Sequence, residues 1–265
     1  KLAAIEAEWN TEEAPASFTV IGIPNQQEMR TDYAIKIPYV MGIIATRSLD
    51  KQVTGLKDLV TEHEQRIRNG MTAYGLLDKL QAGDKSEETI KQFNQVKDDL
   101  GYGLLLKRYT EKVTDATDEQ IKLAAKDSIP EVAPVFFAFR IMVGAGVLML
   151  LLIGIAFYDS ARHRIGERKW HLRALLWGIP LPWIAIESGW FVAEYGRQPW
   201  TIAEVLPTHL SASTLTEGDL WFSLLGICAF YTVLLVVEMY LMFKFARKGP
   251  SSLKSGKYHF ETKSV

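Results

Sequence analysis

The 265-residue sequence has a single cysteine and no excess of positive charge. One cysteine, Cys228, excludes an internal disulfide framework and any CxxC metal or redox motif. Lys and Arg number 30 against 31 Asp and Glu, so a surface that neutralises phosphates is not expected, and neither is a nucleic-acid partner. The motifs HExxH and GxSxG are absent, and the five histidines lie outside the long apolar runs, so we expect no histidine metal cluster.

The charge that is present divides the chain into two unlike halves. Residues 1–130 contain 17 Lys and Arg against 21 Asp and Glu, whereas residues 131–265 contain 13 against 10, mostly in short clusters between long apolar runs. Runs of about 20 apolar residues are long enough to cross a bilayer. The sequence predicts an all-α integral membrane protein in which a largely helical extracytoplasmic domain precedes three transmembrane helices and a tail. The first domain, called the loop domain below, comprises residues 1–130. The three spans cover about 133–158, 174–194 and 220–243 within residues 131–248, and the tail comprises residues 249–265.

Basic residues set the expected orientation. The connection Asp159–Arg173 has five Lys and Arg and the segment after the third span has six, whereas Tyr195–Asp219 has only Arg197. The positive-inside rule therefore places the first connection and the C-terminus in the cytoplasm and residues 1–130 outside the membrane. Because the chain begins at Lys1 with no signal peptide or earlier span, we expect it to be the C-terminal part of a longer protein; processing after a removed signal peptide is the alternative.

Periodicity in the first half predicts helices over Arg47–Gly70, Ser86–Leu100 and Ile121–Ile129. The first of these is expected to end at its Asn-Gly pair, and Thr117 with Gln120 fits a capping box before the third. The apolar segment Ile21–Ala45 is broken by two prolines, so we expect extended or loop structure close to the membrane surface.

Charges within the apolar runs indicate function, because each costs about 2.5–3.5 kcal/mol at the centre of a span. Arg140 needs an anionic partner, either on a neighbouring helix or on a cofactor carboxylate or phosphate. Met142 is either packing material or an axial haem ligand. Gly144 and Gly146 suit helix packing through small residues, and would also let a flat macrocycle approach. We expect only a pairing or snorkelling role for Glu238.

The second span has a periodic pattern of aromatic and charged residues. Steps of 4, 3, 4 and 3 separate Trp183, Glu187, Trp190, Glu194 and Arg197, which places all five on one helical stripe. Such a stripe suits a large, planar, charged ligand. The alternative is that the tryptophans form an aromatic belt while Glu194 and Arg197 mark the outer interface. Glu187 has no assigned role.

Three strings of residues resemble one known family. The segment 189–200 (GWFVAEYGRQPW), the opening KLAAIE and the segment 139–142 (FRIM) resemble subunit I of cytochrome bd-type quinol oxidases. The resemblance covers the whole chain, and the long first half is similar to the enterobacterial long-loop form. It implies a nine-span subunit, of which this chain is the C-terminal part, containing the quinol-binding loop and the last three spans.

The resemblance also implies roles at the haems. Met142 would be an axial ligand of a low-spin b haem, and Arg140 would stabilise that haem, through a propionate. Glu194 would ligate the iron of a high-spin b haem. Trp190 would lie on the electron path, and Arg197 would bind haem propionates. The histidine ligands of the family belong to the N-terminal half, so this chain alone would not hold all three haems.

At the quinol site, the resemblance implies that Lys1 and Glu6 bind quinol or accept its protons. The implied activity is that of a terminal respiratory oxidase, which oxidises ubiquinol or menaquinol outside and reduces oxygen to water through b- and d-type haems, separating charge without a pump. The implied partners are the N-terminal half of the subunit, subunit II, small single-span accessory subunits, quinol, oxygen and the lipid bilayer.

Two other functions account for part of the sequence. A membrane-anchored extracytoplasmic sensor or assembly domain without haem would explain the topology, but it gives no reason for charges within the spans. Half of a transporter would use Glu187 as a proton site. Pro180 and Pro182 interrupt the second span, yet the paired broken helices typical of transporters are missing from the sequence.

Overall fold

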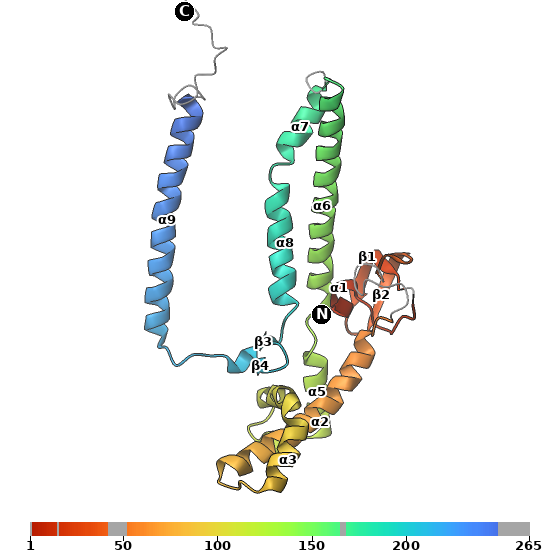
Figure 1. Cartoon of the computed structure of the whole chain (residues 1–265), viewed down its shortest axis with the longest axis vertical. Helices are drawn as coiled ribbons and strands as arrows, with labels where there is room; N and C mark the ends of the chain where they lie inside the picture. Colours follow the sequence, from red (N-terminus) through yellow and green to blue (C-terminus); the bar gives the residue numbers. More distant parts are fainter. Residues whose placement is uncertain (1, 15, 42–51, 165–167, 249–265) are drawn as a thin grey trace, which may run out of the picture. The chain divides into compact units, whose positions relative to one another are not determined.

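The computed structural model describes residues 2–14, 16–41, 52–164 and 168–248 (Figure 1). By compactness the chain divides into Lys1–Ala212 and Ser213–Val265, and the two units are described separately. The described helices and strands are, in chain order, α1 (Leu2–Glu6), β1 (Phe18–Asn25), β2 (Arg30–Ile37), α2 (Leu56–Gln81), α3 (Glu87–Val96), η2 (Lys97–Asp99), α4 (Leu100–Leu104), η3 (Leu105–Arg108), η4 (Val113–Asp115), α5 (Asp118–Asp127), α6 (Val132–Ala161), α7 (Lys169–Trp177), α8 (Leu181–Tyr195), β3 (Trp200–Ile202), β4 (Leu206–Pro207), η5 (Thr208–Leu210) and α9 (Glu217–Lys248).

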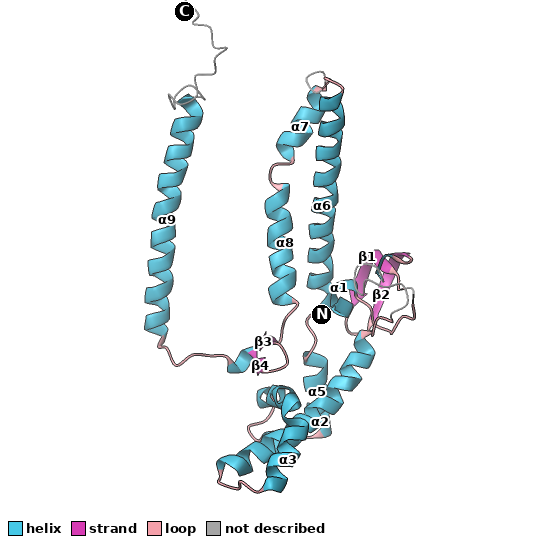
Figure 2. Ribbon diagram, viewed as in Figure 1, coloured by secondary structure: helices cyan, strands magenta, loops and turns pink. Residues whose placement is uncertain are grey.

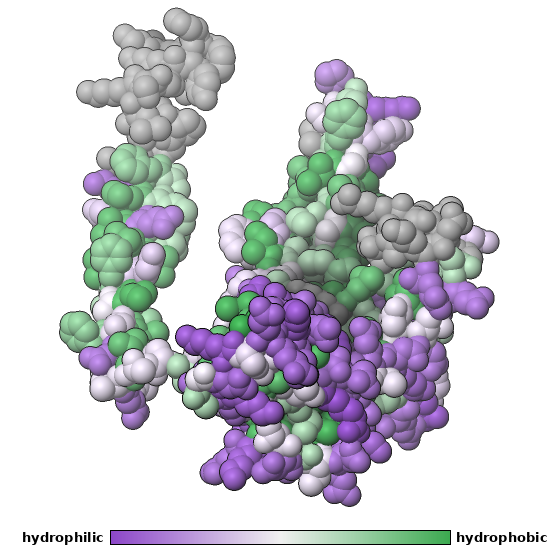
Figure 3. All heavy atoms as spheres, turned by 60° about the horizontal axis from the view of Figure 1, so that its bottom comes forward, coloured by the Kyte–Doolittle hydropathy of each residue, from purple (hydrophilic) through white to green (hydrophobic). Residues whose placement is uncertain are grey.

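Among the described residues, three stretches are long and apolar enough to cross a membrane: α6, the pair α7 and α8, and α9. Their side chains are largely exposed, as at Leu150 (73%) and Phe157 (76%), and apolar residues cover most of the visible face of α9 (Figure 3). Aliphatic side chains left uncovered over such lengths are typical of lipid-facing helices. The prediction of an all-α membrane protein is confirmed, and the strands among the described residues form two small hairpins (Figure 2).

The second span is interrupted. Its polypeptide forms α7 and α8, which are separated at Gly178–Pro180, as the two prolines predicted. Proline lacks an N–H group and is therefore tolerated only at the start of a helix, where Pro182 lies. The connection before it is shorter than Asp159–Arg173, because α6 extends to Ala161 and α7 begins at Lys169.

A buried polar contact joins α6 and α7. Asp159 and His171 are 1% and 0% exposed, and Asp159 Oδ2 lies 3.4 Å from His171 Nδ1. The other ring nitrogen, Nε2, lies 3.2 Å from the carbonyl oxygen of Leu152. These contacts join the start of α7 to the last turns of α6.

The loop domain is organised around α2. The prediction that this helix ends at Asn69-Gly70 is wrong, because α2 continues to Gln81. Gly70 is buried against α4, and a Cβ atom there would lie 2.3 Å from the backbone nitrogen of Gly103. The glycine therefore permits a close helix crossing rather than marking a helix end.

Capping residues set the ends of the shorter helices. Thr117 and Gln120 form the predicted capping box, which begins α5 three residues before Ile121. Ser86 caps α3, but this helix ends at Val96 instead of Leu100, because the single turn η2 intervenes. The predicted span of the helix over Ser86–Leu100 is therefore too long.

The segment predicted as extended forms an antiparallel hairpin of β1 and β2, in which Phe18 pairs with Ile37 and Asn25 with Arg30. The side chain of Asn25 accepts hydrogen bonds from the next backbone N–H groups, at Gln27 and Glu28, and this closes the turn. Residues 42–45 of the predicted segment lie outside the described residues, as do Lys1 and the tail over 249–265.

A small apolar core joins the start of the chain to the first span. Ala3 and Ala4 of α1 pack with Leu56 of α2 and with Val132 and Phe136 of α6. In Figure 1, α1 accordingly lies beside the first turns of α6, next to the hairpin. This core positions the functional residues described below.

Candidate functional site

The predicted quinol residue Glu6 and the predicted haem residue Arg140 form a buried ion pair. Arg140 Nη2 lies 2.7 Å from Glu6 Oε2, and the two side chains are 14% and 3% exposed. Glu6 ends α1, whereas Arg140 lies about two turns into α6, so the short core between these helices brings the pair together. The anionic partner expected for Arg140 is therefore a carboxylate of the loop domain.

Other groups complete the surroundings of Arg140. Its Nε donates a hydrogen bond of 3.1 Å to the carbonyl oxygen of Thr19 on β1, and its Nη1 donates to the carbonyl oxygen of Ile5. The guanidinium carbon lies 3.6 Å from the ring centroid of Phe136, which is a cation–π contact. A buried cation is tolerated because oxygen atoms and an aromatic face replace its water.

Burial dominates the titration of Glu6. It raises the pKa of the carboxyl group, and the charge and hydrogen bond of Arg140 offset only part of this increase. The negative charge of Glu8 adds to it. Glu6 is therefore a carboxylate that accepts a proton more readily than an exposed glutamate does.

Met142 faces the second span. A Cβ atom built on Gly189 of α8 would lie 3.0 Å from the sulfur of Met142, so the absence of a side chain at Gly189 allows the two helices to meet at this level. By contrast, Cβ atoms on Gly144 and Gly146 would meet no atom of the described chain within 4 Å. Among the described residues α8 contacts α6 at Met142 rather than at these two glycines, so their role in helix packing stays a prediction.

The charged and aromatic stripe of α8 is exposed. Its members that lie within the helix are all exposed, at positions 183, 187, 190 and 194. Arg197 follows the end of α8 at Tyr195 and still reaches back, with its Nη2 3.4 Å from Glu194 Oε1. The stripe therefore presents two tryptophans and two carboxylates on one uncovered face.

Comparison with known proteins decides the family. The sequence model of cytochrome bd terminal oxidase subunit I matches residues 1–250. The chain belongs to this family. It is 48% identical over 255 residues to cytochrome bd-II ubiquinol oxidase subunit 1 of Escherichia coli, covering 96% of this chain and 50% of that protein. It is 26% identical over 250 residues to cytochrome bd ubiquinol oxidase subunit 1 of Bacillus subtilis, covering 94% and 42%. The chain thus spans about half the length of the curated relatives it matches.

Haem is the cofactor that this family implies, and the donor set of the chain fits it. A thioether (Met142) and a carboxylate (Glu194) are both chemically able to bind iron, and Arg197 supplies a cation for carboxylate groups. The open space beside Gly144 and Gly146 suits the approach of a flat ring to α6. The exposed stripe of α8 is a second surface that a flat ring can approach.

A cavity of about 280 Å³ lies between the loop domain and the end of α8. It is lined by Ala4 of α1, by Arg197 and Glu204 from beyond α8, and by His63 and Ser128. His63 Nδ1 lies 2.6 Å from the hydroxyl oxygen of Ser128, and burial lowers the pKa of the histidine. Arg197 and Ala4 of α1 thus line the same cavity.

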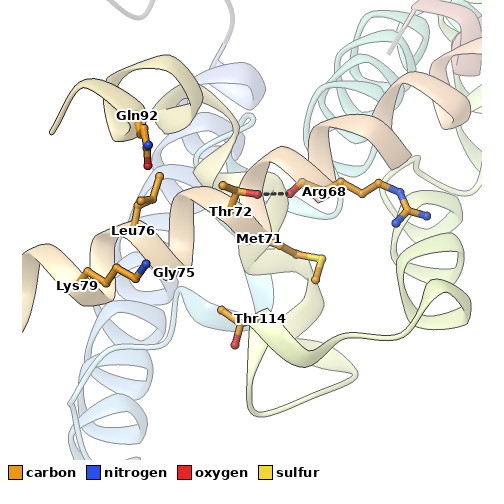
Figure 4. A pocket seen from close by; sticks show the side chains of 8 residues that line it. All are labelled: Arg68, Met71, Thr72, Gly75, Leu76, Lys79, Gln92 and Thr114. Atoms are coloured by element: carbon orange, nitrogen blue, oxygen red, sulfur yellow. Dashed lines mark hydrogen bonds between the residues drawn. The ribbon is translucent and has the colours of Figure 1, made fainter. Parts of the chain in front are cut away.

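A second cavity, of about 590 Å³, lies along α2 (Figure 4). Figure 4 shows the hydroxyl group of Thr72 donating a hydrogen bond of 3.3 Å to the carbonyl oxygen of Arg68. Its other lining residues are Met71, Gly75, Leu76, Lys79, Gln92 and Thr114. They comprise no carboxylate, and we assign no function to this cavity.

Sequence reasoning missed several residues of the site. Glu8, Lys36 and Glu12 form a chain of ion pairs beside Glu6, and Thr19 holds Arg140 through a backbone carbonyl. A backbone acceptor leaves no trace in the residue type. Charged residues of these types are common on protein surfaces, so only their partners distinguish Glu8, Lys36 and Glu12. Lys1, predicted to act with Glu6, lies outside the described residues.

Proposed function

We propose that this chain is the quinol-oxidising and haem-binding C-terminal part of a terminal oxidase that transfers electrons from quinol to oxygen. The observation that carries the proposal is the Glu6–Arg140 ion pair at 2.7 Å. It joins the helix proposed to bind quinol to the span proposed to hold a haem. An anchored sensor domain would give no reason to bury this pair.

Glu6 is proposed to take a proton from quinol. Its raised pKa makes the ionised carboxylate a better proton acceptor than an exposed glutamate, while the charge of Arg140 favours the ionised form. Lys1 is proposed to orient the quinol beside it. The loss of two protons and two electrons converts quinol to quinone. In this proposal the protons leave to the outside, whereas the electrons pass to the haems.

The electron side is proposed to use residues of α6 and α8. Bound b- and d-type haems would supply one-electron carriers between quinol and oxygen. Met142 would bind the iron of a low-spin b haem, and Glu194 that of a high-spin b haem. Arg197 would hold propionate groups, whereas Arg140, for which the resemblance implies the same role, has its guanidinium bound to Glu6 and to the carbonyl oxygens of Ile5 and Thr19. Trp190, one helical turn before Glu194, would lie between the haem sites.

The proposed orientation follows the basic residues. The loop domain over 1–130 and the segment 195–219 would lie outside the inner membrane, and the tail would lie in the cytoplasm. Quinol protons would then leave outside while oxygen reduction takes protons from inside, which separates charge without a pump. The N-terminal half of the subunit, subunit II and small single-span subunits are the proposed partners, and ubiquinol or menaquinol the substrate.

A reduced-minus-oxidised visible spectrum of the membrane-extracted complex tests this proposal. We expect bands of b-type haem together with those of a chlorin-type d haem. Substitution of Lys1 or Glu6 should lower quinol oxidation more than oxidation of an artificial donor. A complex without haem would reject the proposed function, and equal losses with both donors would move Lys1 and Glu6 away from the quinol site.

A further inference from the structure

We propose that Glu8, Lys36 and Glu12 form an exit path that carries quinol protons from Glu6 to external water. The inference rests on the proposed function, because it needs Glu6 to receive the proton. It gives a role to three residues that the proposed function leaves without one. The term exit path refers below to these three residues.

Glu8 lies next to the hairpin, through its ion pair with Lys36, and close enough to Glu6 for its charge to act on that carboxyl group. Ala7 has φ 51°, a left-handed conformation that ends α1 between the two glutamates. The N–H group of Glu8 donates to the carbonyl oxygen of Ala3 at 2.9 Å, and its own carbonyl accepts from Leu56 at 2.9 Å. These bonds fix Glu8 at the junction of α1 and α2, where its side chain is only 10% exposed.

Lys36 then connects Glu8 to Glu12. Its Nζ lies 3.1 Å from Glu8 Oε2 and 2.6 Å from Glu12 Oε1. Lys36 stands opposite Thr19 in the hairpin, and Thr19 is the residue whose carbonyl holds Arg140. One pair of strands therefore supports both ends of the route.

Exposure increases along the route. The side chain of Glu6 is 3% exposed, that of Glu8 is 10% exposed and that of Glu12 is 28% exposed. Ser17 also donates to Glu12 through its backbone N–H and its hydroxyl group. A proton that leaves Glu6 by way of Glu8 thus reaches a carboxylate that is in contact with water.

The proton affinities fall in the same direction. Burial raises the pKa of Glu8, as it does that of Glu6, and the charge of Lys36 offsets only part of the effect. Partial burial by itself would raise the pKa of Glu12, but hydrogen bonds from Lys36 and Ser17 outweigh it and lower that pKa. The inner two carboxylates therefore take up a proton readily, and the outer one releases it.

Lys36 acts as a positioning residue rather than a proton carrier. Burial would lower its pKa, but hydrogen bonds to Glu12 and Glu8 and their charges outweigh burial and raise it. The ammonium group accordingly stays charged and holds the two carboxylates on either side of it. Each quinol releases two protons, which leave one after the other by this route, while both electrons pass to the haem acceptors and finally to oxygen.

Glu8→Gln in the complete oxidase complex tests the exit path. The amide keeps an oxygen for Lys36 but does not take up a proton. We expect the rate of oxygen consumption with a short-chain quinol to fall at least about tenfold. This loss should be smaller than the roughly hundredfold loss expected on removing an acid–base group that contacts the substrate. Oxidation of tetramethyl-p-phenylenediamine, which gives up electrons without protons, should not change. The solvent deuterium isotope effect on quinol oxidation should rise.

Glu13→Gln is the matched control, because Glu13 is an exposed glutamate of the same segment. If Glu8→Gln behaves like Glu13→Gln with both donors, the exit path is overturned while the proposed function stands. Equal losses with both donors would also overturn it, because they would indicate a structural role. If Glu8→Gln does not assemble, Lys36→Gln is used instead, and the same donor-specific loss is expected. A wild-type complex that oxidises neither donor would reject the proposed function and the exit path with it.

Discussion

Glu6 and Arg140 are separated by 134 positions in the sequence, yet their charged groups meet at 2.7 Å in a site that is almost closed to water. A buried ion pair stabilises a fold less than its distance suggests, because both charges lose hydration. Removal of one partner is costly, because the other charge is left buried without compensation.

Glu6→Ala should therefore destabilise the complex by about 3 kcal/mol or more. Thermal unfolding of the purified complex measures this change. The double variant Glu6→Ala/Arg140→Leu should recover part of the loss, because no buried charge remains. Glu13→Ala, on the exposed part of the same segment, should have no measurable effect. A double variant less stable than Glu6→Ala would contradict this account of the pair.

Quinol oxidation should depend on pH through Glu6. Only the ionised carboxylate accepts a proton, so turnover falls as the pH falls through the pKa of Glu6. Because burial raises that pKa above its ordinary value of 4.5, the fall should begin at a higher pH than it would for an exposed glutamate. Rates measured against pH with quinol and with a proton-free donor check this. The same acid limb with both donors would assign it to another group.

Met142→Leu should abolish the low-spin b-haem signal while the protein remains in the membrane. Leucine keeps the apolar contact with Gly189 but has no sulfur to bind iron. The reduced visible spectrum measures the result. Met149→Leu, two helical turns further along α6, is the matched control and should leave the spectrum unchanged. An unchanged spectrum in Met142→Leu would reject the ligand assignment.

Glu194→Ala should perturb the high-spin b haem and slow oxygen reduction, because the carboxylate proposed to bind its iron is removed. The low-spin signal should remain. Glu217→Ala, at the start of α9, removes a carboxylate outside the proposed haem sites and serves as the control. Normal oxygen reduction and a normal high-spin signal in Glu194→Ala would count against the assignment.

Gly70→Ala should destabilise the loop domain by about 1–3 kcal/mol, the usual cost of overpacking. The new methyl group would lie 2.4 Å from the carbonyl oxygen of Asp99, so α2 and α4 would have to separate. Gly75→Ala is the control on the same helix, because its methyl group would lie 3.3 Å from the side chain of Thr114. Protease resistance of the loop domain in the complex compares them. Equal resistance of both variants would refute the close crossing.

The sequence by itself determined the parts that depend on local physics. Long apolar runs determine three spans, because a bilayer requires about 20 apolar residues in a row. The capping box at Thr117 and Gln120 determines the start of α5 by local hydrogen bonds. The prolines 180 and 182 determine the break in the second span, because proline lacks the N–H group that a helix needs.

Tertiary structure decided what depends on distant partners. In the sequence, Gly70 indicates the end of a helix, whereas in the structure it lies within α2 and packs against Gly103. Arg140 requires an anion, but only the packing of α1 on α6 selects Glu6 from the 31 acidic residues. Glu8, Lys36 and Glu12 are ordinary surface residues in the sequence. Lys36 lies on β2, whereas Glu8 and Glu12 lie between α1 and β1, so the three meet only because this segment packs against the hairpin.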